Sequence, residues 1–193
     1  MILIDDQIQE YTPEEIARWT DELPEWRRKQ VLAYKNDMGR RQSLLAYRLL
    51  CQGLREEYGI MEQPTFVYNE HGKPSLALPP PGGDGEGLYF SLSHCKEGVC
   101  CAISDRPVGI DIESANRKIS DSVIRYSMNE GEQALIRESD DPQRTFLRLW
   151  TQKEAVLKRL GTGIRDDMRD ILSDHAYTIE VRENERYILS VAW

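Results

Sequence analysis

Apolar residues recur at helical spacing through the first sixty positions of the chain. Residues 12–15, Thr-Pro-Glu-Glu, combine an N-cap residue, a proline in the first turn and a capping-box glutamate, and they predict the start of a short helix. A second helix is expected to follow Pro24 and to run to about Lys35. A longer helix is predicted over roughly residues 39–58, where leucines recur on one face and arginines lie off it.

The pattern then changes to short runs of alternating or continuous apolar residues, which are typical of strands. Strands are expected at residues 65–68, 88–93, 99–104 and 108–113, with turns at 69–72 and 96–98. The proline- and glycine-rich segment 79–87 predicts a surface loop, because neither a helix nor a central strand accommodates it.

Helical signals return in the second half of the chain. Asn129 and Glu132 form a capping box for a helix that runs to about Glu138. A longer helix is predicted from Pro142 to Leu160, with Gly161 as the residue that ends it. The tail alternates over residues 176–181 and 186–192 and predicts a terminal hairpin. This order of helices, strands, helices and strands predicts an α+β chain with two similarly ordered halves.

Composition narrows the class of protein. The chain has 193 residues, 40% of them hydrophobic and 30% charged, which predicts one globular domain or two small subdomains that share a core. An acidic start with no long apolar run predicts neither a secretory signal nor a membrane span. Four cysteines without a CxxC pair disfavour structural zinc and a disulfide framework, and they favour a cytoplasmic location.

Charge is distributed unevenly. The net charge of −8 argues against a protein that coats nucleic acid. Residues 26–48, however, hold seven basic side chains and one acidic one. This segment is a candidate site for a compact polyanion such as a phosphorylated small molecule, and a solvated helix face is the equally weighted alternative.

Two carboxylates share one face of the strand predicted at residues 108–113. Side chains alternate along a strand, so Gly109, Asp111 and Glu113 point the same way, and the two carboxylates lie about 7 Å apart at the backbone. Such a pair beside a glycine that leaves room suits Mg²⁺ with retained waters, which usually bridges to a substrate phosphate. The alternative is an amphipathic edge strand with a polar outer face.

Trp150, Glu154 and Lys158 lie along one side of the helix predicted before Gly161. Glu154 is a candidate metal ligand or base, and Lys158 is a candidate phosphate contact. The alternative is an exposed Glu–Lys pair worth only ~0.3–0.5 kcal/mol. His94, at the end of a predicted strand, is expected to be structural, because no serine–histidine–aspartate order or zinc-type spacing surrounds it.

Three segments occur in a diagnostic order between Phe90 and Gly163. They are the pair Ser93-His94, the strand Gly-x-Asp-x-Glu, and the helix Trp-x-x-Lys-Glu-Ala-x-x-Lys-x-x-Gly-x-Gly. This ordered set resembles the 4′-phosphopantetheinyl transferases, which move the phosphopantetheine arm of coenzyme A onto a serine of a carrier protein.

The length of the chain resembles the surfactin-synthetase-activating type of that family. This resemblance implies two pseudo-symmetric α+β halves, each a small antiparallel sheet packed with a long helix. The halves would comprise residues 1–104 and 105–193, with the active site at their interface. It also implies a monomer that acts on coenzyme A and an apo acyl or peptidyl carrier protein, with no nucleic acid or membrane as a partner.

The resemblance also implies roles for individual residues. The implied catalytic residues are Glu154, Lys158 and Asp111, and the implied magnesium ligands are Asp111, Glu113 and Glu154. Glu154, or a water that it orients, would take the proton of the carrier serine, while Lys158 would stabilise the pyrophosphate or protonate the leaving group. The implied coenzyme A contacts are Arg41, Lys73, Ser93, His94, Lys153 and Lys158. Arg41 would meet the 3′-phosphate, a role for which Arg40 and Gln42 are alternatives.

Two other functions remain open at this level. A different magnesium-dependent phosphotransferase or nuclease would use the same three carboxylates, although the net charge disfavours a nuclease. A carrier-binding module without catalysis is the second alternative, and the intact set Asp111, Glu113, Glu154 and Lys158 disfavours it.

Overall fold

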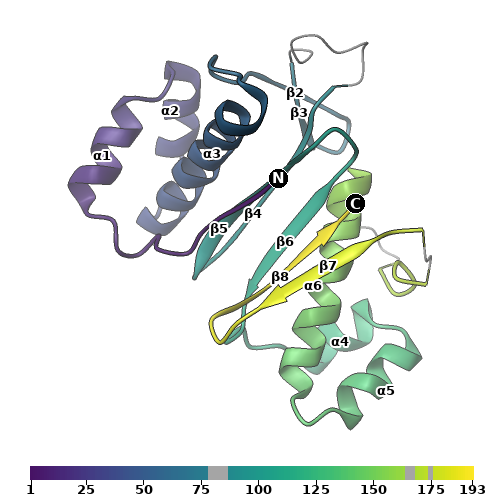
Figure 1. Cartoon of the computed structure of the whole chain (residues 1–193). Coiled ribbons are helices and arrows are strands. Elements are labelled where there is room, and N and C mark those ends of the chain that lie inside the picture. The colour runs from purple at the N-terminus through teal and green to yellow at the C-terminus, as the bar shows by residue number, and fades with distance from the viewer. Residues whose placement is uncertain (78–86, 164–167, 174–175) are drawn as a thin grey trace.

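The computed structural model describes residues 1–77, 87–163, 168–173 and 176–193 (Figure 1). These residues form an α+β fold, as predicted. One three-stranded antiparallel sheet has the order β1 (Ile2–Asp5), β5 (Gly98–Ser104), β4 (Tyr89–Cys95). A second has the order β6 (Gly109–Ser114), β8 (Tyr187–Ala192), β7 (Ile179–Glu183). A hairpin of β2 (Phe66–Tyr68) and β3 (Pro74–Leu76) forms a separate two-stranded sheet, and Phe66 and Leu76 pack against the core beside the first sheet.

The helices of the first half follow their sequence signals. Thr12 and Glu15 form the predicted capping box before α1 (Pro13–Asp21). Helix α2 (Glu25–Leu32) ends three residues before the expected position. Helix α3 (Asp37–Tyr58) ends at Gly59, which adopts the left-handed conformation at φ 64°. Buried leucines of α3 pack against β5 of the first sheet.

In the second half, α5 (Glu130–Glu138) and α6 (Pro142–Leu160) confirm the predicted helices and their caps. Gly161 ends α6 in the left-handed conformation, at φ 71°. Helix α4 (Asp121–Ser127) and strands β1 and β3 were not expected. The terminal hairpin is confirmed, although β7 begins later than expected. The predicted loop 79–87 lies, except for Gly87, outside the described residues.

The two sheets lie between α3 and α6 and pack on each other (Figure 1). Apolar residues of β5, among them Cys100 and Ala102, share a core with Ile110 of β6 and with Leu189 and Val191 of β8. Cys101 points to the other face of β5, into the core beneath α3, so both cysteines of the pair that the sequence placed in a strand are buried. All four cysteines are free.

The sheets meet where β4 runs beside β6, and side chains bridge this seam. The hydroxyl oxygen of Ser91 accepts the amide N–H of Ile110 at 3.1 Å, and that of Ser93 accepts the N–H of Ile112 at 3.4 Å. Sheet membership changes between Ser104 and Gly109. The domain boundary at residue 104 and the pseudo-symmetry of the halves remain predictions. No helix among the described residues is long and apolar enough to cross a membrane.

Candidate active site

The polar face of β6 is covered by α6 rather than by solvent. A Cβ atom added at Gly109 would lie within 3.0 Å of the Ala155 carbonyl oxygen and the Arg159 amide nitrogen, both in the α6 backbone. The glycine therefore makes room for the helix, and the expectation that it clears space for a cation is wrong. The alternative is right that β6 is an edge strand of its sheet, but the polar face of the strand is covered by α6 rather than open to solvent.

Asp111 is the centre of a small buried network. It is only 5% exposed, and its Oδ1 atom accepts the Ser93 hydroxyl at 2.9 Å and the Lys158 ammonium at 2.7 Å. Lys158 also donates to the Ser93 hydroxyl oxygen at 2.7 Å. Withdrawal from water lowers the pKa of Lys158, but the Asp111 carboxylate outweighs this and the net pKa is raised. Lys158 is therefore positively charged and paired with Asp111. This excludes the alternative that Glu154 and Lys158 form an exposed ion pair on the helix surface.

Glu113 is oriented by Trp150, which lies one turn before Glu154 on the same side of α6. Its Oε1 atom accepts the Trp150 indole N–H at 3.2 Å and pairs with Arg117. The Arg117 guanidinium lies 5.2 Å from the centre of the Trp150 ring. Burial, followed by repulsion from Asp111, raises the pKa of Glu113. The side of α6 that carries Trp150 and Lys158 therefore packs against the face of β6 that carries Glu113 and Asp111, as two side-chain contacts show.

Glu154 lies between these contacts and carries an unsatisfied oxygen. Among the described residues, the buried atoms Glu154 Oε1 and Asp111 Oδ2 have no hydrogen-bond partner. Burial, followed by repulsion from Asp111, raises the pKa of Glu154 to about 7. Unpaired carboxylate oxygens in a poorly hydrated site are the hard ligands that Mg²⁺ prefers. These two carboxylate oxygens therefore suit a divalent cation bound by Asp111 and Glu154.

The three carboxylates are not assembled into a finished metal site. Within the described ranges, no three His, Cys, Asp or Glu side chains are grouped closely enough to hold one ion. In this conformation Lys158 neutralises Asp111, and Trp150 and Arg117 hold Glu113. The ligand set Asp111, Glu113 and Glu154 remains a proposal.

A pocket of about 340 Å³ opens beside this network. The β2–β3 hairpin, β4 and α6 contribute its walls, which are lined by His71, Gly72, Lys73, Pro74, Phe90, Ser91, Leu92, Glu154, Leu157, Lys158, Gly161 and Gly163. Lys73 donates to the Arg159 carbonyl oxygen at 3.0 Å, and burial, followed by the nearby Arg159 charge, lowers its pKa. Apolar walls with a lysine at each side suit a ligand that combines a flat body with phosphate groups.

The sequence missed the apolar walls of this pocket. Phe90 and Leu92 alternate with the serines of β4, and Leu157 follows Glu154 by three positions. Leu157 lies about one helical turn from Glu154, so the helical repeat contains its signal. Alternation places Phe90 and Leu92 on the face of β4 opposite Ser91 and Ser93, so the strand pattern does not predict that they share a pocket with Ser91.

His94 and Lys153 lie away from this pocket's lining. His94 is exposed on β4, and partial loss of hydration, followed by the Lys158 charge, lowers its pKa. Lys153 is 0% exposed, and its ammonium pairs with Glu132 Oε2 at 2.7 Å and donates to the Ser127 and Met168 carbonyl oxygens, both at 2.9 Å. The structure therefore uses Lys153 to tie α4 and α5 to α6.

The basic segment 26–48 is not gathered at the pocket. Arg41, whose side chain is 11% exposed, pairs with Asp37 at 2.6 Å and donates to the Tyr11 carbonyl oxygen at 2.6 Å. Arg40 donates to the Tyr34 carbonyl oxygen at 2.9 Å, and Gln42 to that of Cys95 at 2.9 Å. These side chains hold local structure, and the 3′-phosphate contact of Arg41 remains a prediction.

The fold and the site together define the class of protein: an α+β protein with buried carboxylates and a paired lysine beside a pocket of about 340 Å³. Residues 107–191 match the model of the 4′-phosphopantetheinyl transferase superfamily. This segment therefore belongs to that superfamily, and the resemblance read from the motifs is confirmed.

Similar curated proteins carry the same description. The chain is 34% identical over 128 residues to 4′-phosphopantetheinyl transferase psf-1 of Bacillus pumilus, covering 64% of this chain and 52% of that protein. It is 30% identical over 141 residues to the transferase gsp of Aneurinibacillus migulanus, covering 72% and 56% respectively. The transferase Sfp of Bacillus subtilis (strain 168) is 32% identical over 101 residues, covering 51% and 42%. The chain therefore spans about half the length of the curated relatives it matches.

Proposed function

We propose that this chain transfers the 4′-phosphopantetheine arm of coenzyme A to a serine of an apo-carrier protein and releases 3′,5′-ADP. The observation that carries this proposal is that Glu154 and Lys158 lie in the wall of a pocket that also contains Lys73, with buried Asp111 paired to Lys158. Asp111 and Glu154 each have one unpartnered carboxylate oxygen. The family assignment of residues 107–191 supports it independently.

The proposed reaction is a phosphoryl-type transfer. The carrier serine oxygen bonds to the phosphorus that bears the pantetheine arm, and the bond from that phosphorus to the oxygen of the departing 3′,5′-ADP breaks. Glu154, directly or through one water, accepts the serine proton. Lys158 donates hydrogen bonds to the pyrophosphate, where negative charge grows as the bond breaks.

A bound Mg²⁺, held by Asp111 and Glu154 with Glu113 as the third ligand, would neutralise part of the pyrophosphate charge. Ser93 positions both Asp111 and Lys158, since its hydroxyl donates to the carboxylate and accepts from the ammonium. In this conformation the one hydroxyl proton of Ser93 is committed to Asp111. A direct contact from Ser93 or His94 to coenzyme A remains part of the proposal.

We propose that the apolar lining of the pocket, where Pro74 and Leu92 are partly exposed, receives the flat base of coenzyme A and that Lys73 and Lys158 meet its phosphates. The lining of the pocket supports this arrangement, because apolar surface and the two ammonium groups lie in one cavity. We further propose, from the resemblance to the surfactin-synthetase-activating type, that the chain acts as a monomer. The four free cysteines favour a cytoplasmic location.

Mass spectrometry of an apo-carrier incubated with the chain, coenzyme A and Mg²⁺ tests the activity. The proposal expects the carrier to gain the mass of the phosphopantetheine arm, and it expects a chelator to stop the reaction until Mg²⁺ is restored. A different phosphotransferase or an inactive carrier-binding module would leave the carrier's mass unchanged under the same conditions.

Glu154→Gln tests the assigned base and metal ligand. The substitution keeps the shape of the side chain and removes its charge, so turnover is expected to fall by about 10²–10⁴-fold. Glu138→Gln is the matched control, since Glu138 is an exposed glutamate at the end of α5. Equal turnover in the two variants would exclude the assigned role of Glu154.

A further inference from the structure

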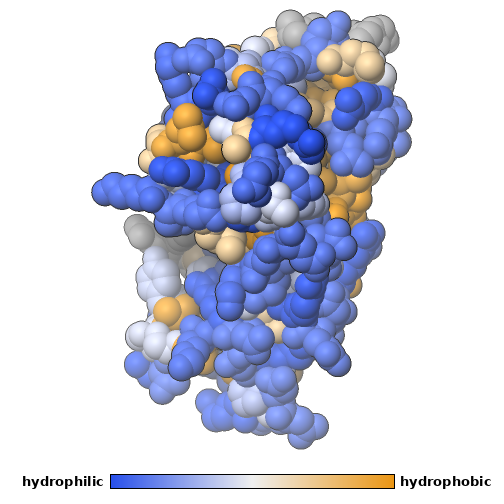
Figure 2. Space-filling view, turned by 90° about the vertical axis from the view of Figure 1, so that its left-hand side faces the viewer, coloured by the Kyte–Doolittle hydropathy of each residue, from blue (hydrophilic) through white to orange (hydrophobic). Residues whose placement is uncertain are grey.

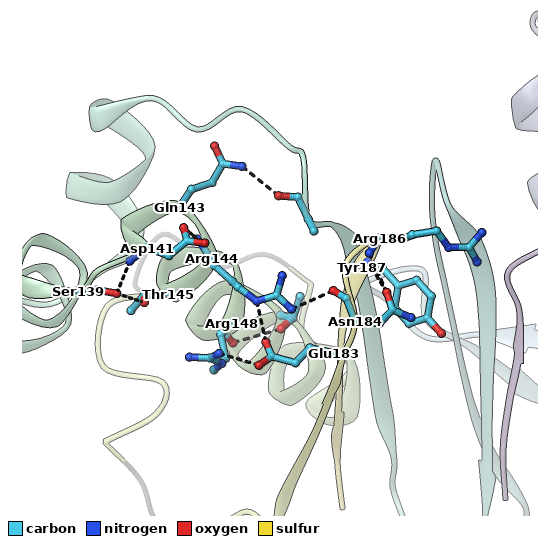
Figure 3. A network of polar contacts seen from close by, with 12 residues as sticks. Ser139, Asp141, Gln143, Arg144, Thr145, Arg148, Glu183, Asn184, Arg186 and Tyr187 are labelled. Carbon is cyan, nitrogen blue, oxygen red and sulfur yellow. Dashed lines mark hydrogen bonds and ion pairs between the residues drawn. The ribbon is translucent and has the colours of Figure 1, made fainter.

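Helix α6, which carries Glu154 and Lys158, is held near each end by the turn of a hairpin. Near its N-terminus, Arg144 donates to the Asn184 carbonyl oxygen at 2.9 Å and Arg148 pairs with Glu183 at 2.8 Å, both in the β7–β8 hairpin (Figure 3). At its C-terminus the partner is the β2–β3 hairpin, which belongs to the other half of the chain. There the Asn69 amide nitrogen donates to the Gly161 carbonyl oxygen at 2.9 Å.

Asn69 also organises the turn from which it reaches α6. Its side-chain oxygen accepts the amide N–H groups of His71 at 3.0 Å and of Lys73 at 2.8 Å. One side chain therefore shapes the turn with its oxygen and binds the helix end with its nitrogen. An asparagine amide has an acceptor and two donors, whereas an aspartate carboxylate has acceptors only.

The hairpin and the helix end are in close contact at this point. A Cβ atom added at Gly161 would lie 2.8 Å from Lys73 Cδ and 3.3 Å from Asn69 Nδ2. Lys73 adds a hydrogen bond to the Arg159 carbonyl oxygen at 3.0 Å. The last carbonyl groups of a helix have no partner within the helix, so these two side chains supply partners from a segment about ninety residues away.

We infer that Asn69 is a positioning residue that sets the spacing between the two walls of the coenzyme A pocket. One wall is the hairpin with Gly72 and Lys73, and the other is α6 with Glu154 and Lys158. The hydrogen bond from Asn69 to Gly161 joins these walls at the pocket's edge. This inference rests on the proposed function for the identity of the ligand but not for the tie itself.

Asn69→Asp tests the inference. The aspartate keeps the oxygen that shapes the turn, loses the donor to Gly161, and places negative charge at the C-terminal end of a helix, where it is unfavourable. The KM for coenzyme A is expected to rise about tenfold while kcat stays within about twofold, because Glu154 and Lys158 are untouched. Backbone amides of residues 69–77 and 159–163 are expected to exchange hydrogen faster.

Asn184→Asp is the matched control, in the equivalent turn of the other hairpin. The Asn184 side-chain oxygen likewise accepts two turn N–H groups, from Arg186 at 2.8 Å and Tyr187 at 3.0 Å. Its amide nitrogen makes no hydrogen bond to any residue in the described part of the chain. The control is expected to leave KM, kcat and exchange at residues 69–77 unchanged.

Two results overturn the inference: unchanged exchange at residues 69–77 and 159–163 in Asn69→Asp, or a fall in kcat with an unchanged KM. If Asn69→Asp does not fold, Asn69→Ser replaces it, because serine still accepts a turn N–H but does not reach Gly161. A wild-type chain that transfers nothing to a carrier refutes the proposed function instead. In that case the comparison of amide hydrogen exchange between Asn69→Asp and Asn184→Asp alone decides whether Asn69 joins the two walls.

Discussion

Replacing Gly109 by alanine places one methyl group between β6 and α6. The added Cβ would lie within 3.0 Å of the Ala155 carbonyl oxygen and the Arg159 amide nitrogen, with the Ala155 carbonyl carbon at 3.0 Å. These are backbone atoms in the C-terminal third of a nineteen-residue helix, so no side chain can rotate to relieve the overlap. The helix, the strand or both must move.

The magnitude follows from the nature of the contact. Overpacking a well-packed core typically costs 1–3 kcal/mol when side chains absorb part of the strain. Because backbone absorbs all of it here, we expect Gly109→Ala to lower the free energy of unfolding by about 3 kcal/mol or more, roughly a hundredfold in the folding equilibrium. Moving α6 outward also separates Glu154 and Lys158 from Asp111, so carrier modification is expected to fall in the fraction that remains folded.

Urea unfolding followed by tryptophan fluorescence measures this change. Gly131→Ala is the control, because its added Cβ meets the Asn129 side chain at an ordinary 3.5 Å. Gly131 lies in the first turn of α5, where alanine is expected to stabilise by about 0.5–1 kcal/mol. Replacing glycine by alanine is thus expected to lower the free energy of unfolding at position 109 and to raise it at position 131. A loss below 1 kcal/mol at Gly109 with full activity would refute the proposed approach of β6 and α6.

Three further substitutions test other parts of the structure. Lys153→Met is expected to cost about 3–5 kcal/mol in urea unfolding because it leaves Glu132 charged and buried, and adding Glu132→Gln should recover part of that loss. Lys158→Ala is expected to lower turnover by about 10²–10³-fold with coenzyme A affinity nearly unchanged, measured by single-turnover kinetics and calorimetry; unaltered turnover would remove it from catalysis. Arg41→Ala is expected to raise the KM for coenzyme A but not for its 3′-dephospho form, and equal effects on both would exclude a 3′-phosphate contact.

Local signals predicted the helices of this chain well. The capping boxes at Thr12 and Asn129 and the left-handed glycine at Gly161 act within one turn of backbone, so the residues that decide each boundary are adjacent in sequence. Strand β1 is four residues long and is ordered by its pairing with β5, almost a hundred positions away. Helix α4 is seven residues long and lacks a side-chain cap, so neither element has a strong local signal.

The candidate site shows the same division between local and distant causes. Strand alternation and helical spacing correctly predicted that Asp111 and Lys158 each lie on a face with other candidate residues. They did not predict that the two faces meet, which depends on Gly109 and on the packing of α6. The motif alone does not predict which of its residues reach the pocket. Glu154 lines the pocket, whereas the adjacent Lys153 pairs with Glu132.

The serine seam between β4 and β6 has a consequence for the solubility of each half. Both strands are the outer strands of their sheets, and such strands carry unpaired N–H and C=O groups that recruit other chains into aggregates. Two of the outward N–H groups of β6, those of Ile110 and Ile112, are satisfied by hydroxyls of Ser91 and Ser93 rather than by a neighbouring backbone. Each half therefore protects the other from strand-to-strand association. A fragment that begins after Ser104 would expose the β6 edge, and its tendency to aggregate should rise although every strand of its own sheet is present.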